Sequence, residues 1–256
     1  TPKPSSAASD VYKRQDKVCV VTGAAGGIGI EIARELASVG ARVALLDRDE
    51  AGAARAAADI AESGARAIAL GCDITDKADV ERAAAAVERE LGRCDVLVNN
   101  AATIYAAALM DIDIERWHRL MAVNLDGFLL CAQAFGRQMI AAGGGSMVHV
   151  ASISGRVPQP YSGPYSISKA GVKMLSQLLA VELGEHRIRS NVVSPAMVRT
   201  PLTEGIYTQP EVLAKREAIV PAGRISGPKD IAEVVAFLAS PRSGLSLIHI
   251  SEPTRL

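Results

Sequence analysis

The sequence has no excess charge of either sign and no long apolar run. Its 256 residues carry 28 basic and 28 acidic side chains, so neither nucleic acid nor an anionic membrane is an expected partner. The longest apolar stretches are too short, and too often interrupted by glycine or charge, to cross a bilayer. The first residues also lack the order of charged and apolar segments that marks a signal peptide.

Paired cysteines are missing as well. The four cysteines are scattered along the chain, and no two of them form a CxxC pair or a metal-ligand spacing. The four histidines share no such spacing either. We therefore predict that the protein holds no metal and works in a reducing cytoplasm.

Short β-branched runs alternate with helical patterns along the chain. Strands are predicted at residues 18–22, 43–47, 67–72, 96–99, 146–151 and 189–194, and helices at 29–40, 50–63, 77–91, 114–139, 165–184 and 229–240. This alternation indicates βαβ units, which build a parallel sheet covered by helices on both faces. We predict one doubly wound α/β domain of the Rossmann type, with ligands at the carboxyl ends of its strands.

A glycine-rich turn follows the first predicted strand. Gly23, Gly27 and Gly29 have the spacing GxxxGxG within Thr22–Gly29, just before a predicted helix. Glycine lets backbone N–H groups approach a phosphate, and a helix N-terminus favours the anion. Because strand, turn and helix follow in this order, the segment predicts a site for the pyrophosphate of a dinucleotide.

Acidic residues end the second and third predicted strands. Asp47 stands 18 residues after Gly29, where a carboxylate accepts hydrogen bonds from the adenosine ribose and repels a 2′-phosphate. It favours NAD over NADP, although the neighbouring Arg48 is a residue type that binds phosphate. Asp73 has two interpretations: it contacts adenine, or it caps the next helix or turn.

Tyr165 and Lys169 form the second chemical motif. They are four residues apart in a predicted helix and so share one face, and Ser152 follows a predicted strand. A phenol has an ordinary pKa of about 10, and we expect the Lys169 ammonium and a positive nicotinamide ring to lower it. Ser152 would hold the substrate oxygen, and Asn124 would bind a backbone carbonyl or a water leading to Lys169. Beside a dinucleotide, this acid/base group predicts hydride transfer.

Together these motifs resemble the short-chain dehydrogenase/reductase family, in its main subfamily, from about Lys17 to about Ser243. TGAAGGIG at residues 22–29, NNAA at 99–102 and SPAMVRT at 194–200 are similar to its cofactor motifs, with Ala102 and Ala196 in place of glycine. The resemblance implies that Asn124, Ser152, Tyr165 and Lys169 are the catalytic tetrad. It implies cofactor contacts from Thr22, Gly23, Gly27, Ile28, Gly29, Asp47, Asp73, Ile74, Asn100, Ala101, Tyr165, Lys169, Pro195, Val198 and Thr200.

Three activities are compatible with these residues. The first is hydride transfer between NAD(H) and a small secondary alcohol or ketone. The alternative is an NADP-dependent enzyme similar to 3-oxoacyl-(acyl-carrier-protein) reductases, against which Asp47 argues. The third is a nucleotide-sensing module without turnover, which would require a broken tetrad. The family resemblance also implies a homotetramer or homodimer built on the helices around residues 109–139 and 165–183.

Both ends of the chain depart from the family pattern. Residues 245–256 replace the family's last strand, and they and residues 10–15 resemble a translated sequencing adapter. We expect non-native or disordered tails at 1–15 and 245–256 around a domain at 16–244, with its last strand missing or replaced. Residues 202–227 should form the substrate lid. Tyr105, Met110 and Tyr161 are further candidates to face the substrate, and His149 is expected to be a core or cofactor-side residue.

Overall fold

Six parallel strands form the central sheet of the computed structural model, which describes residues 16–201, 203–208 and 210–246. Their spatial order is β3-β2-β1-β4-β5-β6. The order reverses between β1 and β4, which is where doubly wound sheets bind ligands. The strands are β1 (Val18–Thr22), β2 (Arg42–Asp47), β3 (Ala67–Gly71), β4 (Val96–Asn99), β5 (Gly145–Val150) and β6 (Ile188–Val193). The predicted fold class is therefore confirmed.

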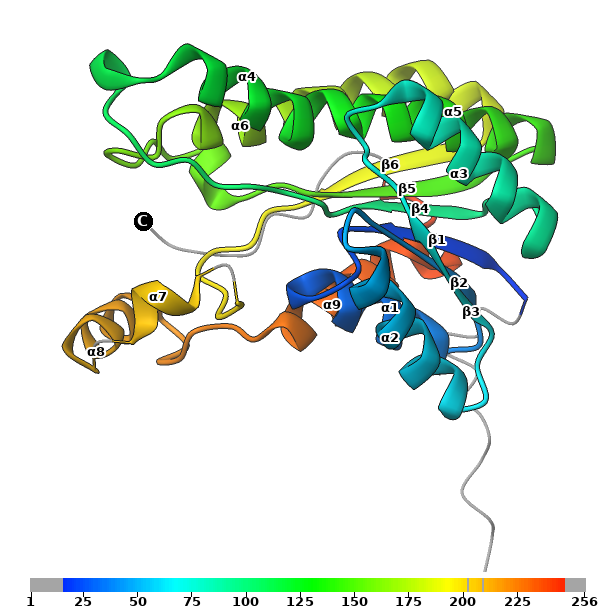
Figure 1. Ribbon diagram of the computed structural model, residues 1–256, viewed down its shortest axis with the longest axis horizontal. Coiled ribbons are helices and arrows are strands. Elements are labelled where there is room, and N and C mark those ends of the chain that lie inside the picture. The colour runs from blue at the N-terminus through cyan, green and yellow to red at the C-terminus, as the bar shows by residue number, and fades with distance from the viewer. Residues whose placement is uncertain (1–15, 202, 209, 247–256) are drawn as a thin grey trace, which may run out of the picture.

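Helices cover both faces of the sheet (Figure 1). One layer holds α1 (Gly27–Ser38), α2 (Glu50–Glu62) and α9 (Pro228–Ala239). The other holds α3 (Lys77–Glu90), α4 (Ile114–Met121), α5 (Gly127–Ala142) and α6 (Pro164–Leu183). Among the helices of the described residues, none has the length and apolar content needed to cross a bilayer.

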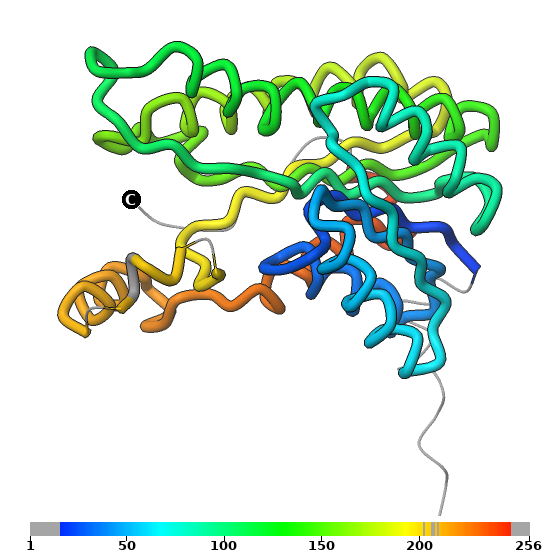
Figure 2. The backbone as a smooth tube through the Cα atoms, in the orientation of Figure 1, coloured from blue at the N-terminus to red at the C-terminus, as the bar shows by residue number. Residues whose placement is uncertain are grey.

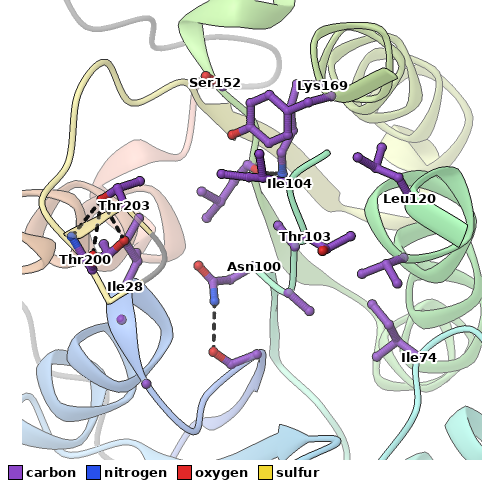
Figure 3. Close-up of a pocket in the computed structure, with 18 of the residues that line it drawn as sticks. Ile28, Ile74, Asn100, Thr103, Ile104, Leu120, Ser152, Lys169, Thr200 and Thr203 are labelled. Carbon is purple, nitrogen blue, oxygen red and sulfur yellow. Dashed lines mark hydrogen bonds between the residues drawn. The ribbon is translucent and has the colours of Figure 1, made fainter. Parts of the chain in front are cut away.

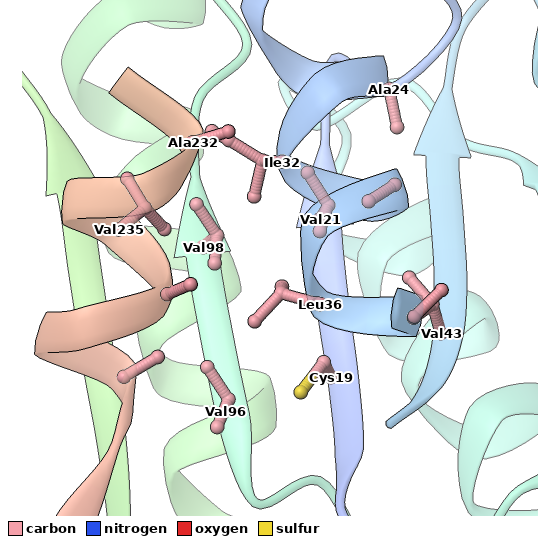
Figure 4. Close-up of a cluster of buried hydrophobic side chains, with 14 of the residues drawn as sticks. Cys19, Val21, Ala24, Ile32, Leu36, Val43, Val96, Val98, Ala232 and Val235 are labelled. Carbon is pink, nitrogen blue, oxygen red and sulfur yellow. The ribbon is translucent and has the colours of Figure 1, made fainter. Parts of the chain in front are cut away.

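The sequence of β1 explains why the sheet is covered on both sides. Every residue of VCVVT is buried, and successive side chains of a strand point to opposite faces. Cys19 and Val21 pack in the cluster beneath α1 and α9 (Figure 4), whereas Val18 and Val20 pack in the cluster beneath α3 and α5. A continuous apolar run is what a strand buried on both faces requires.

Aspartates fix where several helices begin. Asp49, Asp76 and Asp113 each accept a backbone N–H bond at the start of α2, α3 and α4. Such caps satisfy donors that the first helical turn leaves without an intrahelical partner. The helix α1 is different: Gly26 precedes it without a side-chain cap, and its first turn holds no acidic residue. Its N-terminal N–H groups therefore stay available to an anion.

The structure departs from the predicted elements in two places. The helix predicted at 114–139 contains a π-helical turn at Ala122–Asp126, between α4 and α5. The segment predicted to form the lid holds two short helices that the sequence pattern did not predict, α7 (Glu204–Tyr207) and α8 (Pro210–Ile219). Figure 2 shows this segment leaving the sheet after β6 and returning to it at α9.

The predictions for the two tails fall mostly outside the described residues, which begin at residue 16 and end at residue 246. Of the C-terminal segment predicted to be a tail, two residues are described. Leu245 is fully exposed. Ser246 is bonded to Asn191 of β6: its hydroxyl donates to Asn191 Oδ1 at 2.8 Å, and its carbonyl accepts from Asn191 Nδ2 at 2.9 Å.

Candidate active site

A cavity of about 710 Å³ lies at the carboxyl ends of the strands. It brings together most of the predicted site residues, namely Gly23, Gly27, Ile28, Asp47, Asp73, Ile74, Asn100, Ala101, Ser152, Tyr165, Lys169, Pro195, Val198 and Thr200. In Figure 3, Ser152 and Lys169 lie at one end of this cavity and Ile74 at the other, with Ile28 and Thr200 along one side. Thr22, Gly29 and Asn124 do not line it.

Thr22 and Gly29 support the glycine-rich turn from behind. The Thr22 hydroxyl accepts the backbone N–H of Asn100 at 3.0 Å, and the Asn100 amide donates to the carbonyls of Thr22 and Gly23. A Cβ atom at Gly29 would lie 2.0 Å from the Gly23 carbonyl oxygen. Only glycine allows this approach, so Gly29 shapes the turn from outside the cavity.

The part of the cavity next to the glycine-rich turn fits the pyrophosphate and adenosine of a dinucleotide. The turn at Gly23–Gly27 faces the cavity, and the uncapped N-terminus of α1 begins there. Donors and a helix dipole at this position suit a pyrophosphate. The residues Asp47 and Asp73, at the ends of β2 and β3, line the same region and offer acceptors for an adenosine.

Asp47 is held firmly at the end of β2. Its Oδ2 accepts the backbone N–H of Ala25, and its Oδ1 accepts that of Asp49, both at 2.9 Å. Each carboxylate oxygen retains acceptor capacity beyond these bonds. Asp73 makes a similar local turn, because its Oδ1 accepts the N–H and hydroxyl of Thr75, and these bonds hold the pKa of Asp73 below its ordinary value. Asp73 thus both forms a turn and lines the cavity.

The opposite end of the cavity holds Ser152, Tyr165 and Lys169. Tyr165 and Lys169 lie in the first turns of α6, and Ser152 begins a short 3-10 turn at Ile153–Gly155 that packs on α6. A Cβ atom at Gly155 would lie 2.6 Å from the backbone of Lys169. Glycine at position 155 therefore allows the turn after Ser152 to pack closely against the backbone of α6. The sequence pattern did not predict this role.

Burial controls the ionisation of this pair. Lys169 is 1% exposed, and its Nζ donates to the Val150 carbonyl at 2.8 Å and lies 5.8 Å from the centre of the Tyr165 ring. Burial lowers the pKa of Lys169 to about 7. Burial also raises the pKa of Tyr165, against a smaller lowering by a hydrogen bond with Ser152. In the protein alone, Lys169 thus does not produce the expected lowering of the Tyr165 pKa, because desolvation dominates.

Asn124 occupies the middle of the π-helical turn and is fully buried. Its side chain accepts the backbone N–H of Thr103 at 2.8 Å and donates to the Thr103 carbonyl and to Ser168 Oγ. It therefore binds a backbone carbonyl, one of the two contacts expected of it. These bonds connect the loop after β4 to Ser168 of α6, the residue that precedes Lys169.

His149 is fully buried in β5 behind the cavity. Its Nδ1 accepts from the Asn99 amide and its Nε2 contacts Ser190 Oγ, both at 3.1 Å. Because Asn99 Nδ2 can only donate, the proton of the neutral ring sits on Nε2. Burial lowers the pKa of His149 to about 4. The residue does not line the cavity and belongs to the core.

The three candidate substrate contacts outside the tetrad differ in whether they line the cavity. Tyr105 lines the cavity and is 9% exposed, whereas Met110 and Tyr161 are 94% and 69% exposed and do not line it. The cavity also includes residues that the sequence pattern did not single out. Among them are Thr103, Ile104, Arg116, Arg119, Leu120 and Thr203. They lie after β4, on α4 or just before α7, and only the fold shows that these segments meet at the cavity.

Known proteins match almost the whole chain. A family model described as enoyl-(acyl carrier protein) reductase matches residues 23–247. D-threitol dehydrogenase of Mycolicibacterium smegmatis is 38% identical over 90% of this chain and 88% of its own. The chain belongs to the short-chain dehydrogenase/reductase family. This confirms the resemblance, and family membership makes the protein an oxidoreductase of the NAD(P)-dependent kind that acts on CH–OH groups.

Two further relatives of this dehydrogenase/reductase show the range of its family. Cis-4-hydroxycyclohexanecarboxylate dehydrogenase of Sinomonas cyclohexanicum is 41% identical over 88% of this chain and 90% of its own. A gluconate 5-dehydrogenase from Burkholderia cenocepacia J2315, solved with NADP and tartrate, has a TM-score of 0.89 and 32% identity and covers 93% of each chain.

Proposed function

We propose that the protein transfers a hydride between NAD(H) and a secondary alcohol or its ketone, with Tyr165 as the general acid/base. The observation that carries this proposal is one cavity with two chemically different parts. Asp47, Asp73 and the glycine-rich turn at the start of α1 line one part of the cavity, and Ser152, Tyr165 and Lys169 line another. A dinucleotide placed along this cavity would bring its reactive ring to the hydroxyl groups.

Proton transfer is the part of the reaction that the chain's own residues perform. A bound nicotinamide supplies the acceptor or donor of the hydride. When an alcohol is oxidised, the hydride leaves its carbinol carbon, the O–H bond breaks, and Tyr165 as phenolate takes the proton. Ser152 holds the substrate oxygen during this exchange. Lys169, 5.8 Å from the Tyr165 ring centre, stabilises the phenolate when it carries a proton itself. Asn124 fixes the loop and helix around them.

Asp47 supports NAD as the preferred nucleotide. Its carboxylate is anchored by two backbone N–H groups and would lie close to the 2′-position of an adenosine ribose, where a phosphate would be repelled. The Burkholderia cenocepacia relative was solved with NADP. The preference between NAD and NADP is therefore tested by measuring kcat/KM for both nucleotides. The wild type should have the higher kcat/KM with NAD, and Asp47→Ala should lose that bias. Equal use of both nucleotides by the wild type would contradict the proposal.

The substrate is best identified by a panel. The relatives' names include a polyol and a hydroxycyclohexanecarboxylate, and one structure contains tartrate. The panel therefore contains threitol, 4-hydroxycyclohexanecarboxylate, its carboxamide, and a 3-oxoacyl thioester, each tested with both nucleotides by absorbance of the reduced ring. We expect turnover of a secondary alcohol with NAD. Turnover confined to the thioester with NADPH would favour the 3-oxoacyl reductase alternative.

Exposed apolar side chains on α6 support a homo-oligomer. Met174, Leu178 and Val181 are 56%, 51% and 74% exposed and recur at helical spacing, so they share one face. Apolar patches of this kind on helices mark interaction surfaces. We propose that this face meets a second copy of the chain. Light scattering after size-exclusion chromatography should give a dimer or tetramer, and Leu178→Glu should shift it toward the monomer.

A further inference from the structure

The charged residues that line the cavity are unevenly distributed. The acidic lining residues among those described are Asp47 and Asp73, at the ends of β2 and β3. Arg116 and Arg119 of α4 line the cavity as well, without an acidic lining residue on that helix. The wall formed by α4 is therefore positive, while the region at the ends of β2 and β3 carries both carboxylates together with Arg48.

Arg116 is held in place by an aromatic platform. Its guanidinium carbon lies 3.8 Å from the centre of the Tyr105 ring. Tyr105 is itself buried, and its hydroxyl accepts the backbone N–H of Asp113 at 3.1 Å. Stacking fixes the plane of a guanidinium and leaves its N–H groups, at the edge, available to a ligand.

The two arginines differ in their partners. Arg119 lies 3.7 Å from Glu115, one helical turn away. For Arg116, no ion pair is found with any carboxylate of the described residues. The Asp113 carboxylate is engaged at the start of α4, where it accepts the backbone N–H of Arg116. Arg116 is thus a positioned cation at the cavity with unused bidentate hydrogen-bonding capacity.

The Arg116 platform is connected to the proton-transfer group. Two residues beyond Tyr105, the Ala107 N–H donates to the Tyr161 carbonyl at 3.0 Å. The next residue, Ser162, accepts the backbone N–H of Tyr165 at 3.2 Å. Backbone bonds therefore join the loop that carries Tyr105 to the start of α6, where Tyr165 lies.

We propose that Arg116 determines substrate specificity by binding a carboxylate that the substrate carries away from its reacting carbon. The preferred substrate is then a hydroxy acid or the corresponding oxo acid rather than a neutral alcohol. This inference rests on the proposed function. A guanidinium and a carboxylate match in geometry as well as charge, and the exposed edge of Arg116 meets the ligand without displacing another partner.

The test compares 4-hydroxycyclohexanecarboxylate with its neutral carboxamide in the presence of NAD. Wild type should favour the acid in kcat/KM by about tenfold or more. Arg116→Gln should lose most of that preference, mainly through a higher KM for the acid, with a much smaller change in kcat/KM for the carboxamide. Arg116→Lys should recover only part, because an ammonium cannot bind in bidentate fashion. Arg137→Gln, on the outer face of α5 beside Glu81, is the matched control and should behave as wild type.

Calorimetric binding of the carboxylate at saturating NAD separates this inference from the proposed function. Turnover of neutral alcohols with no preference for the acid would overturn the inference and leave the proposed function intact. Equal affinity of Arg116→Gln and wild type for the acid would also overturn the inference and leave the proposed function intact. Absence of turnover of any alcohol with either nucleotide would overturn the proposed function, and binding of the acid would still decide the role of Arg116.

Discussion

Replacing Lys169 by methionine should change how the stability of the protein depends on pH. The side chain is buried, and burial lowers its pKa from the ordinary 10.5 to about 7. The folded protein therefore releases a proton at a lower pH than the unfolded chain does. The stability contributed by the neutral amine is complete above 10.5 and is lost as the pH falls through about 7.

The magnitude follows from that difference in pKa. Between the ordinary 10.5 and about 7 it corresponds to roughly 5 kcal/mol. The wild-type free energy of unfolding should gain up to about 1.4 kcal/mol for each pH unit in this window from Lys169 alone. Lys169→Met lacks this contribution. Its free energy of unfolding relative to that of wild type should therefore be highest near pH 7 and should fall as the pH rises. Loss of the bond to the Val150 carbonyl costs the variant about 1 kcal/mol at every pH.

Urea unfolding between about pH 7 and pH 9.5 measures the effect without nucleotide. The single tryptophan, Trp117, provides the fluorescence signal. Lys173→Met, one turn along α6 at a half-buried position, controls for a lysine-to-methionine change on the same helix. Parallel curves for wild type and Lys169→Met would refute the argument, because they would show that Lys169 keeps its charge in the folded protein.

Two further predictions concern the glycine turn and the core histidine. Gly29→Ala places a methyl group against the Gly23 carbonyl. It should lower the free energy of unfolding by about 1–3 kcal/mol and weaken nucleotide binding in calorimetry. Gly184→Ala, where a Cβ meets no atom within 4 Å, is the control and should have neither effect. His149 has its pKa lowered by burial to about 4, so its contribution to stability is present above 6.5 and lost as the pH falls toward 4. His149→Gln should lack that acid-dependent loss in urea unfolding, and a difference from wild type that stays constant with pH would contradict this.

The alternation of strands and helices and the position of the cavity could be predicted because they depend on local patterns. Apolar runs such as Val18–Thr22 and the glycine spacing after them are contiguous in sequence, and the rules for βαβ units then place their carboxyl ends together. The Tyr165 and Lys169 pair could be predicted for the same reason, since four residues make one helical turn.

What could not be predicted depends on contacts between distant segments. The π-helical turn holds Asn124 against Thr103, which is 21 residues earlier. The periodicity of apolar residues along a helix does not predict such a contact. The pKa of Lys169 follows from its burial among β5, α5 and α6, not from its neighbours in sequence. Arg116 stacks on Tyr105 because the loop after β4 packs against the start of α4, where the Tyr105 hydroxyl accepts the backbone N–H of Asp113.

The central claim, that Tyr165 carries the proton during hydride transfer, is tested most directly by Tyr165→Phe. With NAD and the best substrate of the panel, kcat should fall by about 10²–10⁴, the usual effect of removing a general acid/base. Calorimetric affinity for NAD should stay within a few-fold of wild type, because the hydroxyl contributes little to nucleotide binding. A variant that keeps more than about a tenth of the wild-type kcat would contradict the account.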